Sequence, residues 1–282
     1  MNKMSQIIDG KLVSKKVKED VAVAVDKLAK EGISLTLAVV IVGDNPASRV
    51  YVNNKRKDCA ECGITSLEYA LAEDTSEQDL LNLIDELNTR DDVNGILVQL
   101  PLPKHIDESK VINSISPNKD VDAFHPENVG HIMLGDGKFL PCTPAGVMEL
   151  LAYYNIDVAG KDCVVIGRSN IVGKPMAMLL LQKNATVTIC HSKTRDLAEK
   201  TRNADIIVAA VGRANFVTAD MVKEGAVVID VGINRMDDGK LRGDVDYEAV
   251  AEKASFITPV PGGVGPMTRA VLMKNTLATL EK

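Results

Sequence analysis

The sequence predicts an α/β protein built as two domains. Apolar, β-branched runs alternate with helix-like segments over residues 14–100, and the same alternation returns over residues 161–260. Strands that alternate with helices form a mostly parallel sheet covered by helices. The chain has 282 residues, a length that suits about two domains of roughly 150 residues each. We expect an N-terminal three-layer α/β domain from residues 1–141 and 267–282, and a second domain from residues 142–266.

Each block has its own order of elements. In the first block we expect helices at 14–32, 44–63 and 75–90 and strands at 35–43, 64–71 and 94–100, followed by a loop-rich stretch at 104–140. In the second we expect strands at 161–167, 185–191, 204–212, 225–232 and 255–260, and helices at 142–156, 172–184 and 195–203. A last helix at 268–281 is expected to return to the first domain. Gly32 and Gly63, the last residues of two of these ranges, indicate where the helices end.

Composition argues against several classes of function. The net charge is −6, aromatic residues are 3% and tryptophan is absent, so neither a basic footprint nor a set of stacking platforms for nucleic acid is visible. No apolar run approaches the ~20 residues that span a bilayer, and the N-terminus turns polar too early for a signal peptide. We therefore expect a cytoplasmic protein with no membrane or nucleic-acid partner. The five cysteines are expected to be reduced, and no cluster predicts a metal site.

A loop between a strand and a helix has the features of a phosphate-binding turn. The segment VVIGRSNIVGKP (164–175) places Gly167 and Gly173 where a helix N-terminus presents free N–H groups. Its pattern is not G-x-G-x-x-G, and neither its glycine spacing nor Pro175 fits a P-loop. We expect a Rossmann-like dinucleotide site in which Gly167 makes the turn and Gly173 lets the helix pack closely. An ordinary βα turn is the alternative.

The end of the next strand indicates which dinucleotide would bind. NAD sites place Asp or Glu there for the ribose 2′-hydroxyl, but this strand ends ICHSKT (189–194), with no acid. His191, Ser192 and the nearby Arg168 suit a 2′-phosphate and favour NADP, with a merely solvated strand end as the alternative. The expected cofactor contacts lie in the turn, at this strand end and at the ends of two later strands: Gly167, Arg168, Ser169, Ile171, Gly173, His191, Ser192, Gly212, Gly232 and Ile233.

The first block carries a lysine on an apolar helix face. Tyr51, Lys55, Cys59 and Cys62 follow i, i+4, i+8, i+11 spacing, so they share one face of the expected helix. Desolvation there would favour an uncharged amine on Lys55 and suit it to move protons. A lysine whose stem covers apolar surface is the alternative.

Polar residues also mark the end of the third strand and the loop beyond it. Gln99 is the polar side chain in GILVQLPLP, at the carboxyl end where open α/β sheets bind ligands. Asp120 and Asp122 lie in KDVDAFHP, where loop acids and helix caps are the alternative. Near the C-terminus TPVPGGVGPMT (258–268) contains three prolines and three glycines, which predicts a shaped loop open to close backbone approach, or else a rigid hinge.

Taken together, these segments resemble the bifunctional methylenetetrahydrofolate dehydrogenase/cyclohydrolase family. The resemblance covers nearly the whole chain and rests on GDNPASRVYVNNK, GILVQLPLP, KDVDAFHP, PCTPAGV, GRSNIVGKP, CHSKT, DVGIN and TPVPGGVGPMT, which occur in the family's order. It implies that 5,10-methylenetetrahydrofolate is oxidised with NADP⁺ and that the methenyl product is hydrolysed to 10-formyltetrahydrofolate. It also implies a homodimer formed through the NADP-binding domains.

The resemblance assigns roles to individual residues. It implies that Lys55 handles the protons of hydrolysis, that Gln99 tunes the lysine, and that Tyr51 borders the folate. Asp122 would hold the pterin ring, and Pro261, Gly262 and Gly263 would line the place where nicotinamide and folate meet.

The chain departs from the family pattern at two positions. Ala123 stands where the family commonly has Gly, so a positive φ there would cost strain. Arg269 stands where relatives are usually apolar, and we expect it either near a cofactor phosphate or in solvent.

Other functions stay open on the sequence alone. They are a dehydrogenase that hydrolyses methenyl-folate poorly, a two-domain dehydrogenase of a hydroxy or amino acid, and a catalytically silent nucleotide-binding protein. Lys55, Gln99 and Asp122 argue against the last of these.

Overall fold

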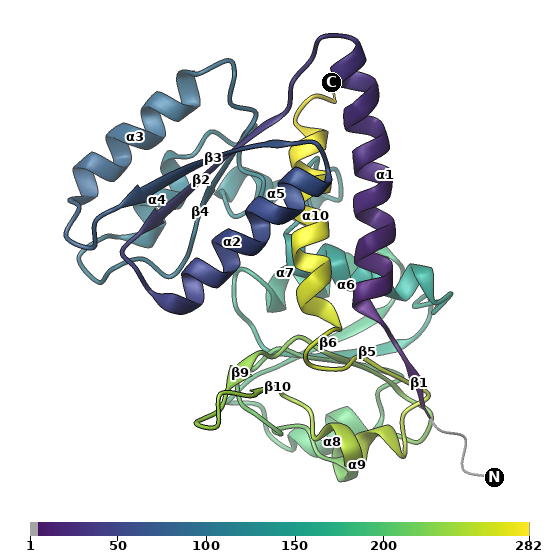
Figure 1. Cartoon of the computed structure of the whole chain (residues 1–282). Coiled ribbons are helices and arrows are strands. Elements are labelled where there is room, and N and C mark those ends of the chain that lie inside the picture. The colour runs from purple at the N-terminus through teal and green to yellow at the C-terminus, as the bar shows by residue number, and fades with distance from the viewer. Residues whose placement is uncertain (1–4, 282) are drawn as a thin grey trace. The chain divides into compact units, whose positions relative to one another are not determined.

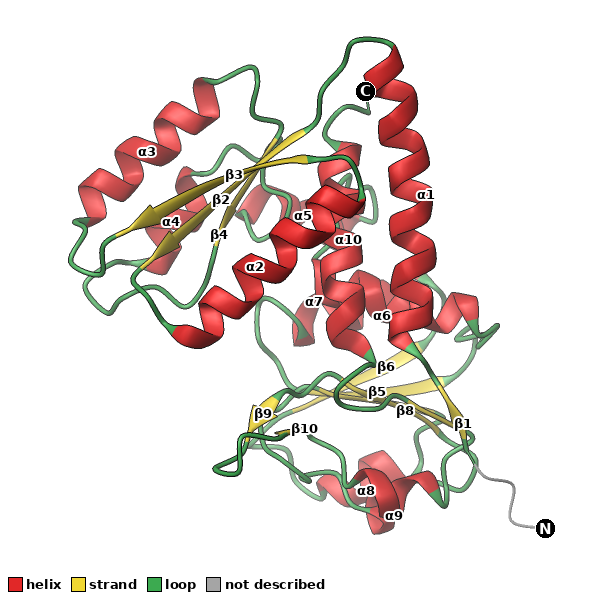
Figure 2. Ribbon diagram, viewed as in Figure 1, coloured by secondary structure: helices red, strands yellow, loops and turns green. Residues whose placement is uncertain are grey.

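The computed structural model describes residues 5–281, except for the side chain of Ala47. These residues divide into two compact units. The N-terminal unit comprises Lys15–Leu140 together with the residues from Arg269 onward, and the C-terminal unit comprises the residues up to Ser14 together with Pro141–Thr268. The expected α/β class is confirmed in both units, which contain parallel sheets covered by helices (Figures 1 and 2).

The N-terminal unit is built around a parallel sheet with the strand order β3–β2–β4. Its strands are β2 (Thr36–Val42), β3 (Thr65–Leu71) and β4 (Gly95–Val98). Its helices are α2 (Pro46–Glu61), α3 (Glu77–Thr89), α4 (Glu108–Ser114) and α5 (Pro126–Leu134), with most of α1 (Gly10–Lys30) and α10 (Val264–Ala278). Every residue of β2 is buried, as a sequence that is apolar after Thr36 predicts for a central strand.

Helices cover both faces of this sheet. One face of β2 and β4 packs against α3 and α4 through a cluster that includes Val40, Ile84, Ile96 and Val111. Figure 1 shows α2 on the opposite side of the sheet from α3, which gives the expected three layers. The connection from β2 to β3 through α2 and the connection from β3 to β4 through α3 run in opposite directions across the sheet, and right-handed crossovers then place the two helices on opposite faces.

Two helices form inside the stretch that was expected to be loop-rich. The carboxylate of Asp107 accepts hydrogen bonds from the N–H groups of Ser109 and Lys110 and so caps α4. The side chain of His125 accepts from Glu127 N and caps α5. Both helices are short, so their apolar periodicity is weak and their ends depend on capping side chains.

The C-terminal unit contains a parallel sheet with the strand order β1–β11–β8–β7–β5–β6. Its strands are β1 (Gln6–Ile7), β5 (Asp162–Ile166), β6 (Thr186–Cys190), β7 (Ile206–Ala209), β8 (Val227–Asp230) and β11 (Phe256–Ile257), with the hairpin β9 (Asn234–Arg235) and β10 (Leu241–Arg242). Its helices are α6 (Cys142–Tyr153), α7 (Gly173–Gln182), α8 (Leu197–Arg202) and α9 (Tyr247–Ala251), with the short 3₁₀ turn Ala219–Met221.

The structure divides the chain differently at its beginning from what the sequence suggested. The expected first domain included the start of the chain, but β1 adds a strand to the C-terminal sheet by pairing with β11. The backbone N–H of Asp9 also donates to the hydroxyl of Tyr154, at 2.8 Å. The chain then passes from one unit to the other inside α1, between Ser14 and Lys15, and again inside α10, between Thr268 and Arg269.

Two general features bear on function. Among the described residues, no helix is both long and apolar enough to cross a bilayer. All five cysteines are free thiols and all are buried.

Candidate functional site

The N-terminal unit pairs a lysine of α2 with a glutamine that follows β4. Lys55 Nζ donates a hydrogen bond of 3.0 Å to Gln99 Oε1, and Gln99 Nε2 donates one of 2.7 Å to the carbonyl oxygen of Leu100. Both side chains are half-buried. Because the amide nitrogen is engaged by Leu100, the amide oxygen is the atom held toward the amine. The structure thus brings together two residues that are 44 positions apart.

The predicted stripe on α2 runs from the surface into the core. Tyr51 is 40% exposed and Lys55 is half-buried, whereas Cys59 and Cys62 are almost completely buried. Burial raises the pKa of the Cys59 thiol to about 12 and that of Cys62 to about 11. Both thiols therefore stay protonated at neutral pH and serve as small core residues, not as nucleophiles. Lys55 lies where this stripe passes from solvent to the core.

The two aspartates after β4 have different surroundings. Asp120 is buried, and its carboxylate accepts hydrogen bonds from His125 N at 2.7 Å and from Asn128 Nδ2 at 2.9 Å. Burial raises the pKa of Asp120, and these bonds tie it to the start of α5. Asp122 is half-buried, and both aspartates line a very small cavity together with Leu100, the residue next to Gln99 in the chain. Asp122 is therefore the more exposed of the two acids near the end of β4.

The C-terminal unit has a tight turn between β5 and α7. Gly167 has φ of +134°, and a Cβ there would lie 2.3 Å from the carbonyl oxygen of Ala210. A Cβ on Gly173 would lie 2.3 Å from the carbonyl oxygen of Gly167, so the helix packs directly on the turn as expected. Ser169 Oγ accepts hydrogen bonds from the N–H groups of Val172 and Gly173, at 3.2 and 3.3 Å. The serine hydroxyl therefore caps α7 in this structure.

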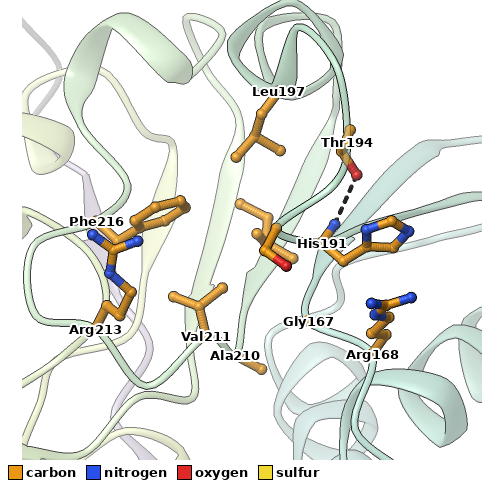
Figure 3. Close-up of a pocket in the computed structure, with 11 residues that line it drawn as sticks. Gly167, Arg168, His191, Thr194, Leu197, Ala210, Val211, Arg213 and Phe216 are labelled. Atoms are coloured by element: carbon orange, nitrogen blue, oxygen red, sulfur yellow. Dashed lines mark hydrogen bonds between the residues drawn. The ribbon is translucent and has the colours of Figure 1, made fainter.

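A cavity of about 460 Å³ opens at the carboxyl ends of the strands beside this turn. It is lined by Ile166, Gly167, Arg168, His191, Ser192, Thr194, Leu197, Ala210, Val211, Arg213 and Phe216. Figure 3 shows Arg168 beside His191 on one side of the cavity, with Arg213 beside Phe216 on the other. The His191 N–H donates to Thr194 Oγ1 at 2.8 Å, which shapes the loop after β6. The cavity thus has an apolar floor between two arginines.

The donors of this cavity fit a phosphorylated dinucleotide. The strand end at β6 presents Ser192 and no carboxylate, and arginine is the preferred cation for phosphate. Gly167 and Gly173 bring the turn and the start of α7 into close backbone contact beside the cavity. Among the described residues, no group of three or more His, Cys, Asp or Glu is placed to hold a metal ion.

The expected cofactor residues do not all line this cavity. Gly167, Arg168, His191 and Ser192 line it, whereas Ser169, Ile171, Gly173, Gly212, Gly232 and Ile233 do not. The sequence reasoning also missed Arg213 and Phe216, whose guanidinium and ring centre lie 5.0 Å apart. The signal that could have found them is the segment VGRANF (211–216), which follows a strand end that was already expected to face the cofactor.

The proline- and glycine-rich segment forms a tight turn that leads into α10. Gly262 has φ of +112°, and Gly263 N donates to the carbonyl oxygen of Pro259 at 2.8 Å. A Cβ on Gly263 would lie 2.6 Å from that same oxygen. A Cβ on Gly10 would lie 1.7 Å from the carbonyl oxygen of Gly263, so α1 begins directly against this turn. Internal packing therefore accounts for these glycines, and contact of Pro261, Gly262 and Gly263 with substrate stays a prediction.

The two departures from the family pattern have structural consequences. Ala123 is buried with φ of +58°, so the strain expected for a residue with a Cβ is present. Arg269 takes neither of its expected positions. Its guanidinium lies 2.8 Å from the carboxylate of Asp58, which is buried on α2 and also accepts from Lys18 Nζ at 2.7 Å.

Family models cover both parts of the chain. Residues 8–122 match the tetrahydrofolate dehydrogenase/cyclohydrolase catalytic domain, and residues 141–282 match the NAD(P)-binding domain of the same family. The chain belongs to the tetrahydrofolate dehydrogenase/cyclohydrolase family. The expected enzyme class and the expected nicotinamide dinucleotide are thereby confirmed.

Individual relatives of this family are similar over nearly their full length. The bifunctional protein FolD of Acetivibrio thermocellus is 61% identical over 273 residues, which are 97% of this chain and 96% of that protein. The crystal structure of the bifunctional FolD methylenetetrahydrofolate dehydrogenase/cyclohydrolase from Campylobacter jejuni is 56% identical, with a TM-score of 0.96 and 98% of each chain covered. The enzyme of Trypanosoma brucei, solved with NADP and an inhibitor, is 38% identical, with a TM-score of 0.94 and coverage of 98% and 97%.

Proposed function

We propose that this chain is a bifunctional enzyme of one-carbon metabolism that acts on reduced folates. It oxidises 5,10-methylenetetrahydrofolate with NADP⁺, which gives the 5,10-methenyl cation and NADPH. It then adds water to the methenyl carbon and releases 10-formyltetrahydrofolate and one proton. Relatives at about 60% identity that carry the name bifunctional protein FolD support both activities. The hydrogen bond from Lys55 to Gln99 is the observation that carries the hydrolytic half.

Lys55 is proposed to move the protons of hydrolysis. Water must lose a proton as it adds to the methenyl carbon, and a positioned amine accepts that proton only while it is uncharged. The amide of Gln99 suits this role because, unlike a carboxylate, it adds no full negative charge that would stabilise the ammonium form. Its hydrogen bond to the Leu100 carbonyl keeps the amide oxygen directed at the amine. Gln99 would thus orient Lys55 without fixing its charge.

Tyr51 and Asp122 are proposed to bind the pterin. Tyr51 lies one helical turn before Lys55 and is 40% exposed, so its ring can border a planar ligand. Asp122 is half-buried and follows the end of β4, and a carboxylate there can accept hydrogen bonds from the N–H groups of a pterin ring. Pro261, Gly262 and Gly263 are proposed to contact substrate through their backbone.

The cavity of the C-terminal unit is proposed to hold the adenosine half of NADP. Arg168 and Ser192 would bind the 2′-phosphate, and the start of α7 after Gly167 would face the pyrophosphate. Ser169, Ile171, Gly173, His191, Gly212, Gly232 and Ile233 would complete the binding groove. When bound, the nicotinamide supplies the acceptor for the hydride.

A lysine-to-methionine substitution tests the hydrolytic assignment. Lys55→Met keeps the length of the side chain and removes the amine, so we expect loss of cyclohydrolase activity with measurable dehydrogenase activity retained. Lys57→Met is the matched control, because Lys57 is exposed on the same helix. Both half-reactions are followed by absorbance, one from NADP⁺ and methylenetetrahydrofolate and the other from methenyltetrahydrofolate alone. Equal loss of both activities in Lys55→Met, with the control unchanged, would contradict a proton-transfer role.

The same dehydrogenase assay tests the choice of cofactor. We expect a higher kcat/KM with NADP⁺ than with NAD⁺, and Arg168→Ala should remove most of that preference. NAD⁺ that works as well as NADP⁺ in the unchanged enzyme would contradict the assignment of Arg168 and Ser192 to a 2′-phosphate.

A homodimer in the cytoplasm is proposed as the working state. The edge strand β6 has partly exposed side chains, including Ile189 at 37%, which leaves it free to meet a second copy. Five free, buried cysteines suit a reducing compartment. Light scattering of the purified enzyme measures the mass, and a monomer at working concentration would contradict the dimer.

A further inference from the structure

A buried carboxylate in the C-terminal unit binds the backbone of a loop that lines the proposed cofactor cavity. Asp244 is completely buried. Its Oδ2 accepts from the N–H groups of Val211 and Gly212, at 2.6 and 2.9 Å, and its Oδ1 accepts from Arg213 N at 2.9 Å. Asn234 Nδ2 also donates to Oδ1, at 2.9 Å. One side chain therefore organises three consecutive peptide groups of the loop after β7.

A second buried carboxylate fixes the first. Asp230, the last residue of β8, accepts from Asp244 N at 2.8 Å and from the N–H groups of Gly232 and Val245, both at 2.9 Å. The two aspartates leave no room for a side chain at Gly232 or Gly243. A Cβ on Gly232 would lie 2.2 Å from Asp244 Oδ1, and one on Gly243 would lie 1.8 Å from Asp230 Oδ2.

The loop that Asp244 holds forms one wall of the cavity. Val211 and Arg213 line it together with Phe216, and Figure 3 shows the Arg213 side chain beside that ring. Gly212 between them has φ of +67°. The three N–H groups of this loop point to the completely buried carboxylate of Asp244, where a backbone donor without an acceptor is costly. Asp244 accepts from all three N–H groups of the loop, and the side chain of Arg213 lies beside Phe216 in the cavity wall.

We propose that Asp244 is a positioning residue for the dinucleotide, which acts by holding residues 211–213 in the conformation that forms the wall of the cavity. Asp244 itself does not line the cavity, so its effect passes through the loop. The inference rests on the proposed binding of NADP in this cavity. It predicts that the carboxylate of Asp244 governs the affinity for the dinucleotide and leaves the chemistry of Lys55 untouched.

The substitution Asp244→Asn tests this inference with little change in volume. An amide has one oxygen, so its NH₂ group must face either Val211 and Gly212 or Arg213 and Asn234. In both orientations two donors lose their acceptor and meet another donor. We expect the dissociation constant for NADP⁺, measured by calorimetry, to rise at least about tenfold, since two donors that face the buried side chain lose their acceptor. The KM for NADP⁺ should rise with it, while kcat at saturating cofactor changes little.

Two controls separate positioning from a general loss of structure. Asp246→Asn changes an aspartate two residues away whose side chain makes no capping hydrogen bond, and it should leave NADP⁺ affinity within about twofold. Cyclohydrolase activity on methenyltetrahydrofolate, assayed without cofactor, should stay within about twofold in D244N. If D244N folds poorly, both proteins are titrated in trimethylamine N-oxide, which favours the compact state.

The outcomes are distinct. Weakened NADP⁺ binding in D244N with cyclohydrolase retained supports the inference. Unchanged NADP⁺ affinity, or equal loss of NADP⁺ binding and cyclohydrolase activity in the folded variant, overturns it. Failure of the unchanged enzyme to bind NADP⁺ would instead overturn the proposed function on which the inference rests.

Discussion

Removal of Arg269 should destabilise the N-terminal unit through the buried charge of Asp58. The Asp58 side chain is 3% exposed and lies between two cations, Lys18 on α1 and Arg269 on α10. Arg269→Met keeps most of the apolar stem and removes the guanidinium. Breaking a buried ion pair by removing one partner costs about 3–5 kcal/mol. Because Lys18 remains at 2.7 Å and still neutralises the carboxylate, we expect the lower figure of about 2 kcal/mol.

The partner substitution should be milder, and the two should not add. Asp58→Asn leaves two cations without a carboxylate, but Lys18 and Arg269 keep 17% and 27% of their side chains exposed and can reach water. The double variant removes the charge that Arg269 neutralises, so it should cost less than the two single substitutions together. We expect a coupling free energy of about 1–2 kcal/mol between Asp58 and Arg269.

Urea unfolding followed by far-ultraviolet circular dichroism measures this coupling, because the chain has no tryptophan for fluorescence. The pair Lys15 and Glu19 on α1 is the control, since its atoms are 3.8 Å apart and its side chains are 76% and 57% exposed. Coupling across that surface pair should stay below about 0.5 kcal/mol. A value for Asp58 and Arg269 no larger than the control would refute the reasoning that burial makes this pair matter.

Three further predictions concern backbone strain, pH and close packing. Ala123→Gly should change the free energy of unfolding by less than about 1 kcal/mol. The substitution relieves about 1–2 kcal/mol of left-handed strain, but it also removes a buried methyl group and makes the unfolded chain more flexible. A loss above about 2 kcal/mol in urea unfolding would contradict this balance. Burial raises the pKa of Asp230 from 3.8 to about 6, so the folded protein binds the proton of this carboxyl group more tightly than the unfolded chain does. The free energy of unfolding therefore falls by about 3 kcal/mol as pH rises through that range. The stability of the unchanged protein relative to Asp230→Asn should therefore fall between pH 4 and pH 7, and a constant difference would show that the carboxyl group does not titrate there. Gly10→Ala should lower the free energy of unfolding by about 1–3 kcal/mol, because its methyl group would meet the Gly263 carbonyl. Gly130 has open space around it, so Gly130→Ala should raise the free energy of unfolding by up to about 1 kcal/mol. Equal midpoints of the two variants in thermal unfolding would contradict the contact between Gly10 and Gly263.

The sheets could be predicted because their strands are read from local sequence. The run LTLAVVIV has Thr36 as its one polar residue and carries no charge, and a strand buried on both faces is the simplest structure that fits it. The helices α4 and α5 were missed because each is short and is held at its start by a capping side chain. The strand β1 was missed because two residues carry no periodicity, and only pairing with β11 defines it.

The candidate site was predictable where residue type alone indicates chemistry. Lys55 and Gln99 were singled out as a lysine on an apolar face and a polar residue at a strand end, and the structure joins them at 3.0 Å. Asp244 gave no such signal, because nothing in GDVD shows that its carboxylate is buried against a loop 31–33 residues earlier. Arg269 was recognised as unusual, but its partner Asp58 lies on a distant helix and follows from the fold alone.

The last helix has a consequence for the order in which the molecule assembles during translation. Asn275 on α10 donates hydrogen bonds of 2.8 Å to the carbonyl oxygens of Val121 and Leu140. The N-terminal unit is therefore completed by residues that are synthesised much later than the rest of it. At about 5–20 residues per second, synthesis from Leu140 to Asn275 lasts roughly 7–27 seconds. Throughout that interval the α10 side of the N-terminal unit lacks its cover, so a nascent chain released early would present apolar surface to chaperones.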